Sequence, residues 1–160
     1  MNGGAAAERG ANVRFPPPLV YLAGILLGVA VGYLVVPAPV PASRAISAIG
    51  GLFVLIVGVG FIASARVHFL RTGQSPVPWR PSPSLIVKGP YRFTRNPMYV
   101  GITLVEVGLG LAVNNLWISL FAVPALLTVH VIAVIPEEKY LSEKFGESYK
   151  IYLAQVRRYL

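Results

Sequence analysis

The sequence predicts an all-α membrane protein with four transmembrane helices, a basic loop and amphipathic C-terminal helices. The first observation is composition: 55% of the 160 residues are hydrophobic and 12% are charged, whereas about 25% of an average soluble domain is charged. The second is that the apolar residues gather in four runs, each near the length of about 20 residues that a bilayer requires. The third is that the basic residues lie in blocks between these runs. At this length we expect one domain.

The first third of the chain is expected to hold a tail and two membrane helices. Residues 1–18 are small, polar and proline-ended, which predicts a flexible N-terminal tail. Leu19–Val36 and Ile46–Ala65 contain no charged residue, so the region 19–65 should form the first two transmembrane helices. No small-residue cleavage site follows the first run directly, which favours a retained anchor over a signal peptide.

The region 98–135 is expected to form a transmembrane helical hairpin. Its two runs contain one ionisable residue each, Glu106 and His130. Such groups are costly inside a membrane and often functional. The two side chains could pair with each other, belong to a substrate site, or face lipid. The runs are Met98–Val113 and Leu116–Ile135, joined by a turn at Asn114-Asn115.

The basic residues predict the orientation. The loop 66–97 carries six Lys and Arg residues and no acid, and the segment 136–160 carries five more. Cytoplasmic loops have an excess of Lys and Arg, so we expect both termini and any active site built from these segments to be cytosolic, in the inner membrane if the source is bacterial. This topology accounts for the net charge of +8, so nucleic acid is not an expected partner. The chain has no cysteine, and we expect no metal site.

The C-terminal segment 136–160 is too polar to span a membrane. Its apolar residues recur every three or four positions, which is typical of an amphipathic helix. Gly146 interrupts the pattern, so we expect two short helices that lie at the membrane interface and complete a cytosolic site. The apolar stripe consists of Leu141, Phe145, Tyr149, Tyr152, Val156 and Tyr159.

Two motifs on the expected cytosolic side carry chemistry. In KGPYRFTRNPMYVG, Asn96 is a favourable N-cap and Pro97 a favourable first helical residue, so a helix N-terminus that attracts anions lies beside Arg95. A plain interfacial turn is the alternative. In IPEEKY, Glu137 and Glu138 suit the first turn of a helix. Together with the basic motif, they could also bind a zwitterion that has an amine and a carboxylate.

The order and spacing of these motifs resemble a known superfamily. The chain reads Leu85-Ile86-Val87-Lys88-Gly89-Pro90-Tyr91, then Arg95-Asn96-Pro97-Met98-Tyr99, then Glu137-Glu138 and Phe145-Gly146-Glu147-x-Tyr149. This pattern is similar to that of the isoprenylcysteine carboxyl methyltransferase and phospholipid methyltransferase superfamily, and the resemblance covers roughly residues 60 to 158.

The resemblance implies S-adenosylmethionine as the methyl donor, bound at the cytosolic face. It implies that a strand-like run over Pro83, Ser84, Leu85 and Ile86 contacts the cofactor through its backbone, and that Tyr91 lines the pocket. Asn96, Pro97, Met98 and Tyr99 would contact the cofactor at the helix start, and Glu137 would bind its amine. Arg95 and Glu138 are the best candidates for catalytic residues.

Two departures from the superfamily pattern bear on the substrate. Asn96 replaces the usual histidine, although it too can donate and accept hydrogen bonds. In eukaryotic members an arginine that engages the substrate carboxylate lies four residues before the cofactor-binding glutamate, and here that position is Ala133. A cation for an anionic substrate would then come from Arg92, Arg157 or Arg158.

The sequence thus predicts a methyltransferase with an amphiphilic or lipidic acceptor in contact with membrane lipids. An isoprenylcysteine-type carboxylate is the first acceptor class. A phospholipid amine and a small thiol are the alternatives. The alternative that is not an enzyme is a membrane scaffold without catalytic activity.

Overall fold

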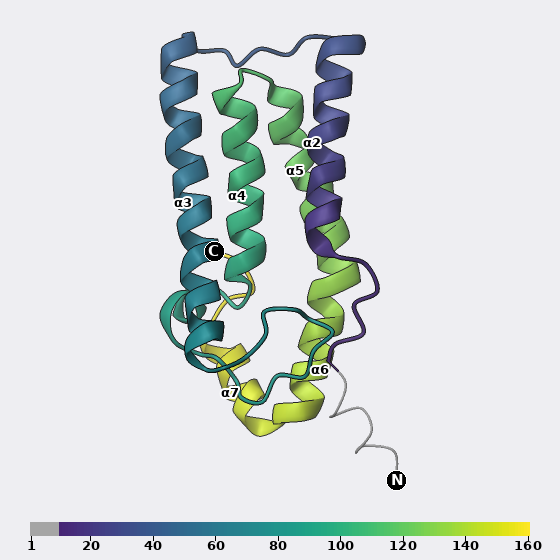
Figure 1. Cartoon of the computed structure of the whole chain (residues 1–160), viewed down its shortest axis with the longest axis vertical. Coiled ribbons are helices and arrows are strands. Elements are labelled where there is room, and N and C mark those ends of the chain that lie inside the picture. The colour runs from purple at the N-terminus through teal and green to yellow at the C-terminus, as the bar shows by residue number, and fades with distance from the viewer. Residues whose placement is uncertain (1–9) are drawn as a thin grey trace.

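The computed structural model describes residues 10–160, in which every regular element is a helix (Figure 1). The first half of the expected tail, residues 1–9, lies outside the described residues. Pro83–Ile86, expected to be strand-like, is an irregular part of the loop between α3 and η1. The elements are α2 (Pro17–Leu34), α3 (Arg44–Arg71), the short 3₁₀ helix η1 (Gly89–Arg92), α4 (Pro97–Ala112), α5 (Leu116–Val129), the π-helical turn η2 (His130–Val134), α6 (Ile135–Phe145) and α7 (Glu147–Gln155).

Within residues 10–160, three helices are long and apolar enough to cross a membrane: α2, α3 and the continuous helix Leu116–Phe145. The fourth apolar helix, α4, has 16 residues and is about 24 Å long. These four helices lie side by side (Figure 1). The expected turn between α4 and α5 lies at Asn114, whose φ of 58° is the left-handed conformation that asparagine tolerates.

The helices pack as two pairs, α3 against α4 and α2 against α5, and α4 also contacts α5. Glycines permit the closest approach in the first pair. A Cβ built on Gly58 of α3 would lie 2.6 Å from the carbonyl oxygen of Gly101 on α4. Small residues at such positions bring membrane helices together. The closely packed α3–α4 pair ends at the loop carrying the basic motif.

Pro136 does not break the last long helix. A proline lacks an N–H and clashes with the carbonyl four residues earlier. The preceding turn, His130–Val134, is π-helical, with the Ile135 N–H bonded to the His130 carbonyl. A π turn accommodates the proline without a sharp break. The chain therefore continues into α6, which begins beside the loop after α3. Gly146, with a φ of 53°, then separates α6 from α7 as expected.

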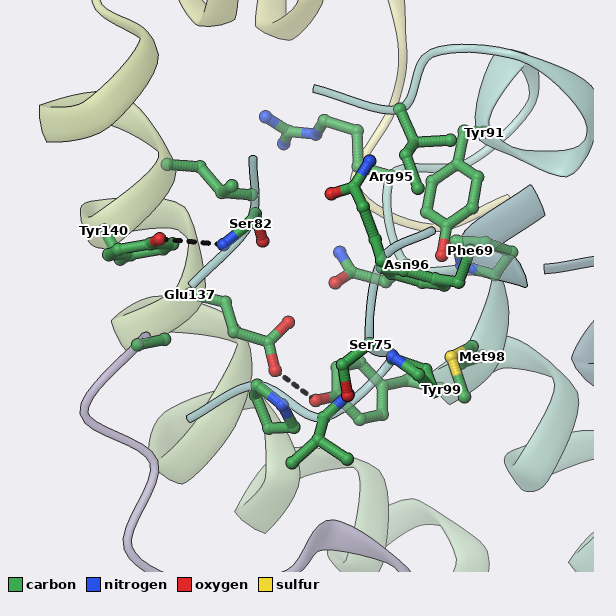
Figure 2. Close-up of a pocket in the computed structure, with 18 of the residues that line it drawn as sticks. Phe69, Ser75, Ser82, Tyr91, Arg95, Asn96, Met98, Tyr99, Glu137 and Tyr140 are labelled. Carbon is green, nitrogen blue, oxygen red and sulfur yellow. Dashed lines mark hydrogen bonds between the residues drawn. The ribbon is translucent and has the colours of Figure 1, made fainter. Parts of the chain in front are cut away.

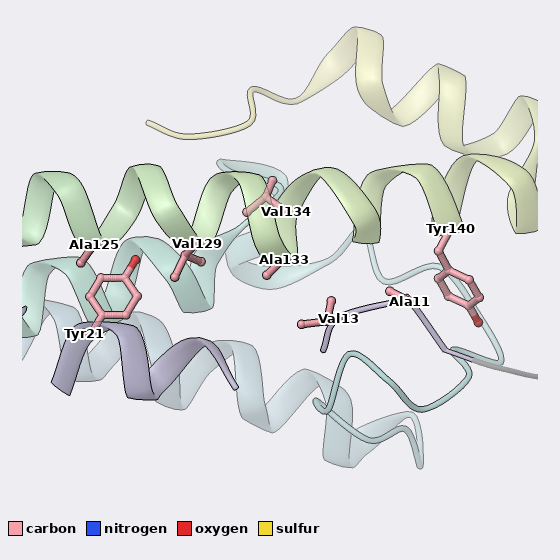
Figure 3. Close-up of a cluster of buried hydrophobic side chains, with 8 residues drawn as sticks. All are labelled: Ala11, Val13, Tyr21, Ala125, Val129, Ala133, Val134 and Tyr140. Carbon is pink, nitrogen blue, oxygen red and sulfur yellow. The ribbon is translucent and has the colours of Figure 1, made fainter. Parts of the chain in front are cut away.

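One end of the bundle gathers the segments expected to be cytosolic. The loop after α3, η1, α6, α7 and the described start of the chain meet there, whereas the α2–α3 and α4–α5 connections lie at the opposite end (Figure 1). A buried cluster extends from the bundle toward this end. Tyr21 lies beside Val129 on one side, and on the other side Val13 lies beside Ala133 and Ala11 beside Tyr140 (Figure 3).

This cluster corrects the expectation of a flexible tail over residues 10–18. Ala11 and Val13 are only 3% and 6% exposed, and the Ala11 N–H donates a 2.7 Å hydrogen bond to the Pro78 carbonyl. Pro17 and Pro18 already belong to α2. We call residues 10–16 the N-terminal arm. Ala11 and Val13 of the arm are buried against η2, α6 and the loop after α3, whereas Phe15 is exposed. Residues 1–18 alone do not reveal these contacts.

Candidate functional site

A cavity of about 420 Å³ lies at the gathered end of the bundle (Figure 2). Its walls come from the N-terminal arm, the end of α3, the loop over residues 74–86, the η1–α4 junction, α6 and α7. These segments are distant in sequence, so the cavity exists only in the folded chain. Most of its lining is apolar or aromatic, with a few polar groups directed into it, as in most small-molecule sites.

The η1 wall of the cavity is built around Tyr91. Gly89 adopts a φ of 62° against the His68 ring, where a Cβ would collide. The Phe69 and Tyr91 rings meet edge to face at 6.1 Å. From α7, the Tyr152 hydroxyl donates a 2.8 Å hydrogen bond to the Tyr91 carbonyl. Burial raises the pKa of both tyrosines, so their hydroxyls remain protonated at physiological pH.

The start of α4 forms the adjoining wall. Pro97 is the first helical residue, as predicted, but the Asn96 side chain does not cap the helix. Its amide instead donates to the carbonyl oxygen of Arg158 at 3.1 Å, so the expected side-chain cap is wrong. The N–H groups of Met98 and Tyr99 have no carbonyl partner within α4. Both residues line the cavity, so the positive end of the helix dipole faces it.

Glu137 supplies the acidic side of the cavity. Its carboxylate accepts a short hydrogen bond from the Tyr99 hydroxyl, and it points into the space that Arg95 and Asn96 approach from the opposite side (Figure 2). Among the described lining residues, Glu137 and Arg95 are the charged ones. The Nε atom of Arg95 is buried without a partner in the described part of the chain. The cavity therefore presents opposite charges on two facing walls.

Glu138 points elsewhere and fastens the C-terminus. It accepts two hydrogen bonds from Arg158, at 2.9 Å from Nε and 2.8 Å from Nη2, and lies 3.4 Å from Nη2 of Arg95. The backbone N–H of Arg95 also donates to the Arg157 carbonyl at 2.9 Å. These contacts hold the last residues against the start of α4. Glu138 therefore stabilises the C-terminus and does not line the cavity.

The structure brings ten of the sequence-predicted site residues together around the cavity. They are Ser84, Leu85, Ile86, Tyr91, Arg95, Asn96, Pro97, Met98, Tyr99 and Glu137. The remaining candidates are not part of its lining: Pro83, Arg92, Glu106, His130, Glu138, Arg157 and Arg158.

Glu106 and His130 do not meet. The His130 ring is bonded to the Tyr159 hydroxyl at 3.0 Å. Glu106 is 1% exposed and abuts Gly24 of α2, where a Cβ would lie 2.5 Å from its Oε1. Neither carboxylate oxygen has a hydrogen-bond partner among the described residues. Of the three readings, the direct pair is therefore excluded.

Several lining residues were not predicted from the sequence. The loop SPVPWRPSP contributes Ser75 to Trp79 and Ser82, and the arm and the start of α2 contribute Ala11 and Pro16 to Pro18. Tyr140 joins the two sides, because its hydroxyl accepts a hydrogen bond from the Ser82 N–H at 3.0 Å. The sequence feature that could have indicated this loop is its proline content. Four prolines in residues 75–83 restrict its backbone.

A model of the phospholipid methyltransferase family matches residues 46–148. The match covers nearly two thirds of the chain. The chain belongs to the phospholipid methyltransferase family. Membership implies a membrane methyltransferase. The matched segment contains α3, the basic loop, η1, α4 and both acids of α6. No curated protein matches the chain.

The cavity of this phospholipid methyltransferase family member extends beyond the family match on both sides. The N-terminal arm precedes residue 46, while Tyr149 and Tyr152 follow residue 148. Burial raises the pKa of Tyr149 to about 12, so its hydroxyl also stays neutral at the site.

Proposed function

We propose that the chain is a methyltransferase that uses S-adenosylmethionine and methylates an amphiphilic, lipidic acceptor at the cytosolic membrane face. The observation that carries this proposal is the pair of facing charges in one cavity, Glu137 on α6 and Arg95 beside the start of α4. An amino acid moiety has an ammonium and a carboxylate separated by one carbon. A site with one acid and one cation on opposite walls suits such a zwitterion.

The residues present fit this cofactor. Glu137 would hold the ammonium, while Arg95 and the N–H groups at the start of α4 would hold the carboxylate. The aromatic wall of Phe69 and Tyr91 would take the adenine ring by stacking. The volume of about 420 Å³ is within the range of cofactor pockets, about 300–1,000 Å³. The Nε atom of Arg95 is buried without a partner among the described residues, which supports the proposal that a ligand supplies the atom that accepts its hydrogen bond.

When bound, the cofactor supplies a methyl group that is already electrophilic because it is carried by a sulfonium. The protein's part is then mainly positional. The walls would hold the donor at the cytosolic end of the bundle, and the acceptor must bring its nucleophilic atom into line with the methyl group. Neither Glu138 nor Arg158 lines the cavity, so we assign them to holding the C-terminus and not to catalysis.

The acceptor that this geometry favours is the amine of a phospholipid head group. Arg95 and Glu137 would both serve the cofactor, and Arg158 is held by Glu138. Ala133 is fully buried within the apolar cluster, so that position offers no cation. An amine nucleophile needs no cation at the reacting atom. An isoprenylcysteine-type carboxylate, the first class expected from the sequence, would have to compete with the cofactor for Arg95. A small thiol would make little use of the apolar lining of the cavity.

The same proposal fixes the location of the protein. With α2, α3, α4 and the α5–α6 helix as four crossings, both termini, the basic loop and the cavity share the cytosolic side, where the cofactor is made available. The Lys and Arg excess at that end supports this orientation.

Methyl transfer can be measured directly on purified full-length protein. S-adenosylmethionine with a radiolabelled methyl group is incubated with vesicles that contain an amine head group, with a prenylcysteine, or with a small thiol. We expect label in the amine-containing lipid. Label in the prenylcysteine alone would reverse the choice of acceptor. The absence of cofactor binding by calorimetry would remove the enzyme and leave the membrane scaffold.

A further inference from the structure

A second hollow lies on the outer face of the α3–η1 junction. It is a groove of about 470 Å³ whose lining includes Val57, Gly60, Phe61, Ser64, Arg92 and Phe93. None of these six residues lines the cofactor cavity. The 3₁₀ helix η1 separates the two hollows, because Tyr91 faces the cavity while Arg92 lines the groove.

One end of the groove is apolar and lies on a membrane-crossing helix. Val57, Gly60 and Phe61 belong to α3, which is among the helices long and apolar enough to span a bilayer. Gly60 is exposed, and a Cβ placed there would have no neighbour within 4 Å. The missing side chain therefore leaves an open channel between Val57 and Phe61, which an acyl chain can fill.

The other end of the groove is polar and basic. Ser64 lies one turn beyond Gly60 on α3, and Arg92 approaches from η1. Arg92 is exposed, and among the described residues none of the ion pairs includes it. The sequence has no acidic residue between Glu8 and Glu106. An anion at this end would therefore meet a cation and a hydroxyl with no acid nearby in the sequence.

We propose that the groove binds an anionic phospholipid of the membrane. Its acyl chain lies along Val57, Gly60 and Phe61, and its phosphate contacts Arg92 and Ser64. The order of the groove, apolar within the span and cationic at its end, matches the order of chain and head group in the cytosolic leaflet. The bound lipid packs on the outer face of η1, and so supports the wall that carries Tyr91. This lipid is not the methyl acceptor, and its binding does not depend on methyl transfer.

The test measures lipid retention by the purified full chain, without any activity assay. Protein is equilibrated with mixed micelles of phosphatidylglycerol and phosphatidylcholine, and the bound lipid is quantified by native mass spectrometry. We expect phosphatidylglycerol to be retained preferentially. Gly60→Leu fills the groove and should lower that retention. Gly50→Leu is the matched control, because Gly50 lies on the same helix and also has no neighbour within 4 Å.

A second pair of variants tests the charge. Arg92→Gln should lower phosphatidylglycerol retention about fivefold, the effect of one basic residue near an anionic surface, while Arg71→Gln, also exposed and near the end of α3, should not. Equal retention of the two lipids by the unchanged protein would overturn the proposal. So would equal losses in Arg92→Gln and Arg71→Gln, and this comparison decides the matter if Gly60→Leu fails to fold.

Discussion

The Tyr99 hydroxyl donates a hydrogen bond to the Glu137 carboxylate, and so links the first turn of α4 to the first turn of α6 across the cavity. The two residues are 38 positions apart. The bond holds one carboxylate oxygen against Tyr99 and leaves the second oxygen for a ligand. It also makes the position of Glu137 depend on the α4 helix start, where the carboxylate end of the cofactor is proposed to bind.

Replacing Glu137 by glutamine should weaken binding of S-adenosylmethionine. The amide keeps the size of the side chain and can still bond to Tyr99, but it loses the charge that would hold the ammonium. We expect a loss of about 1.5–3 kcal/mol, the range for a hydrogen bond to a charged group, measured by calorimetry on purified protein. Glu143→Gln on the exposed face of α6 is the control. Equal affinities for the two variants would return Glu137 to a helix-capping role.

Replacing Glu138 by glutamine should lower stability more than it lowers cofactor affinity. Glu138 accepts the paired hydrogen bonds of Arg158 and lies beside Arg95, so the substitution weakens one of the contacts that hold the C-terminus. We expect about 1–2 kcal/mol, because the pair is partly exposed and bidentate. Thermal unfolding should show the decrease, with the exposed Lys139–Glu143 pair as a comparison. A stable variant with abolished turnover would instead restore Glu138 as a catalytic residue.

Replacing Gly10 by valine should weaken cofactor binding although Gly10 contacts no charge. A Cβ at Gly10 would lie 2.2 Å from the Trp79 carbonyl carbon and 2.4 Å from the Arg80 nitrogen. Backbone atoms cannot move aside as a flexible side chain can, so the arm must separate from the loop over residues 74–86. We expect about a tenfold loss of affinity, equivalent to about 1.4 kcal/mol. Gly50→Val, at an open position, should bind normally, and an arm without a role would make the two variants alike.

Single cysteines can test the orientation, because the natural chain has none. Ala42 in the α2–α3 connection and Ser148 on α7 are both exposed and lie at opposite ends of the bundle. A membrane-impermeant maleimide should label Ala42→Cys in intact cells and Ser148→Cys only in inverted vesicles. Labelling of Ser148→Cys from outside would place the cavity on the other side of the membrane and contradict the proposed use of a cytosolic cofactor.

The sequence predicted the helices because their signals are local. Uncharged runs located α2, α3 and α5, and Gly146 located the break between α6 and α7. Asn96-Pro97 located the start of α4, but it could not show what the Asn96 side chain bonds to. That choice depends on the Arg158 carbonyl, which comes from the far end of the chain.

The cavity was predictable only in part for the same reason. Tyr91, Tyr99 and Glu137 belong to motifs whose order and spacing can be recognised in the sequence. Ala11 and Val13 do not, because a short apolar pair in a polar tail has no period and its burial comes from α6 and the loop over residues 74–86. The π-helical turn before Pro136 could not be predicted from the sequence either, because a proline in a helical pattern is compatible with a kink, a break or a wider turn.

The N-terminal arm and α7 give the protein a fixed order of completion. The arm precedes the other walls of the cavity along the chain, whereas its partner Tyr140 lies on α6 and the lining residues Tyr149 and Tyr152 lie on α7. Chains generally fold in units from the N-terminus, but the lining of this cavity requires both the arm and α7. The complete site proposed for the cofactor can therefore form only after α7 has been synthesised, so a chain interrupted before Glu147 would enter the membrane without that site.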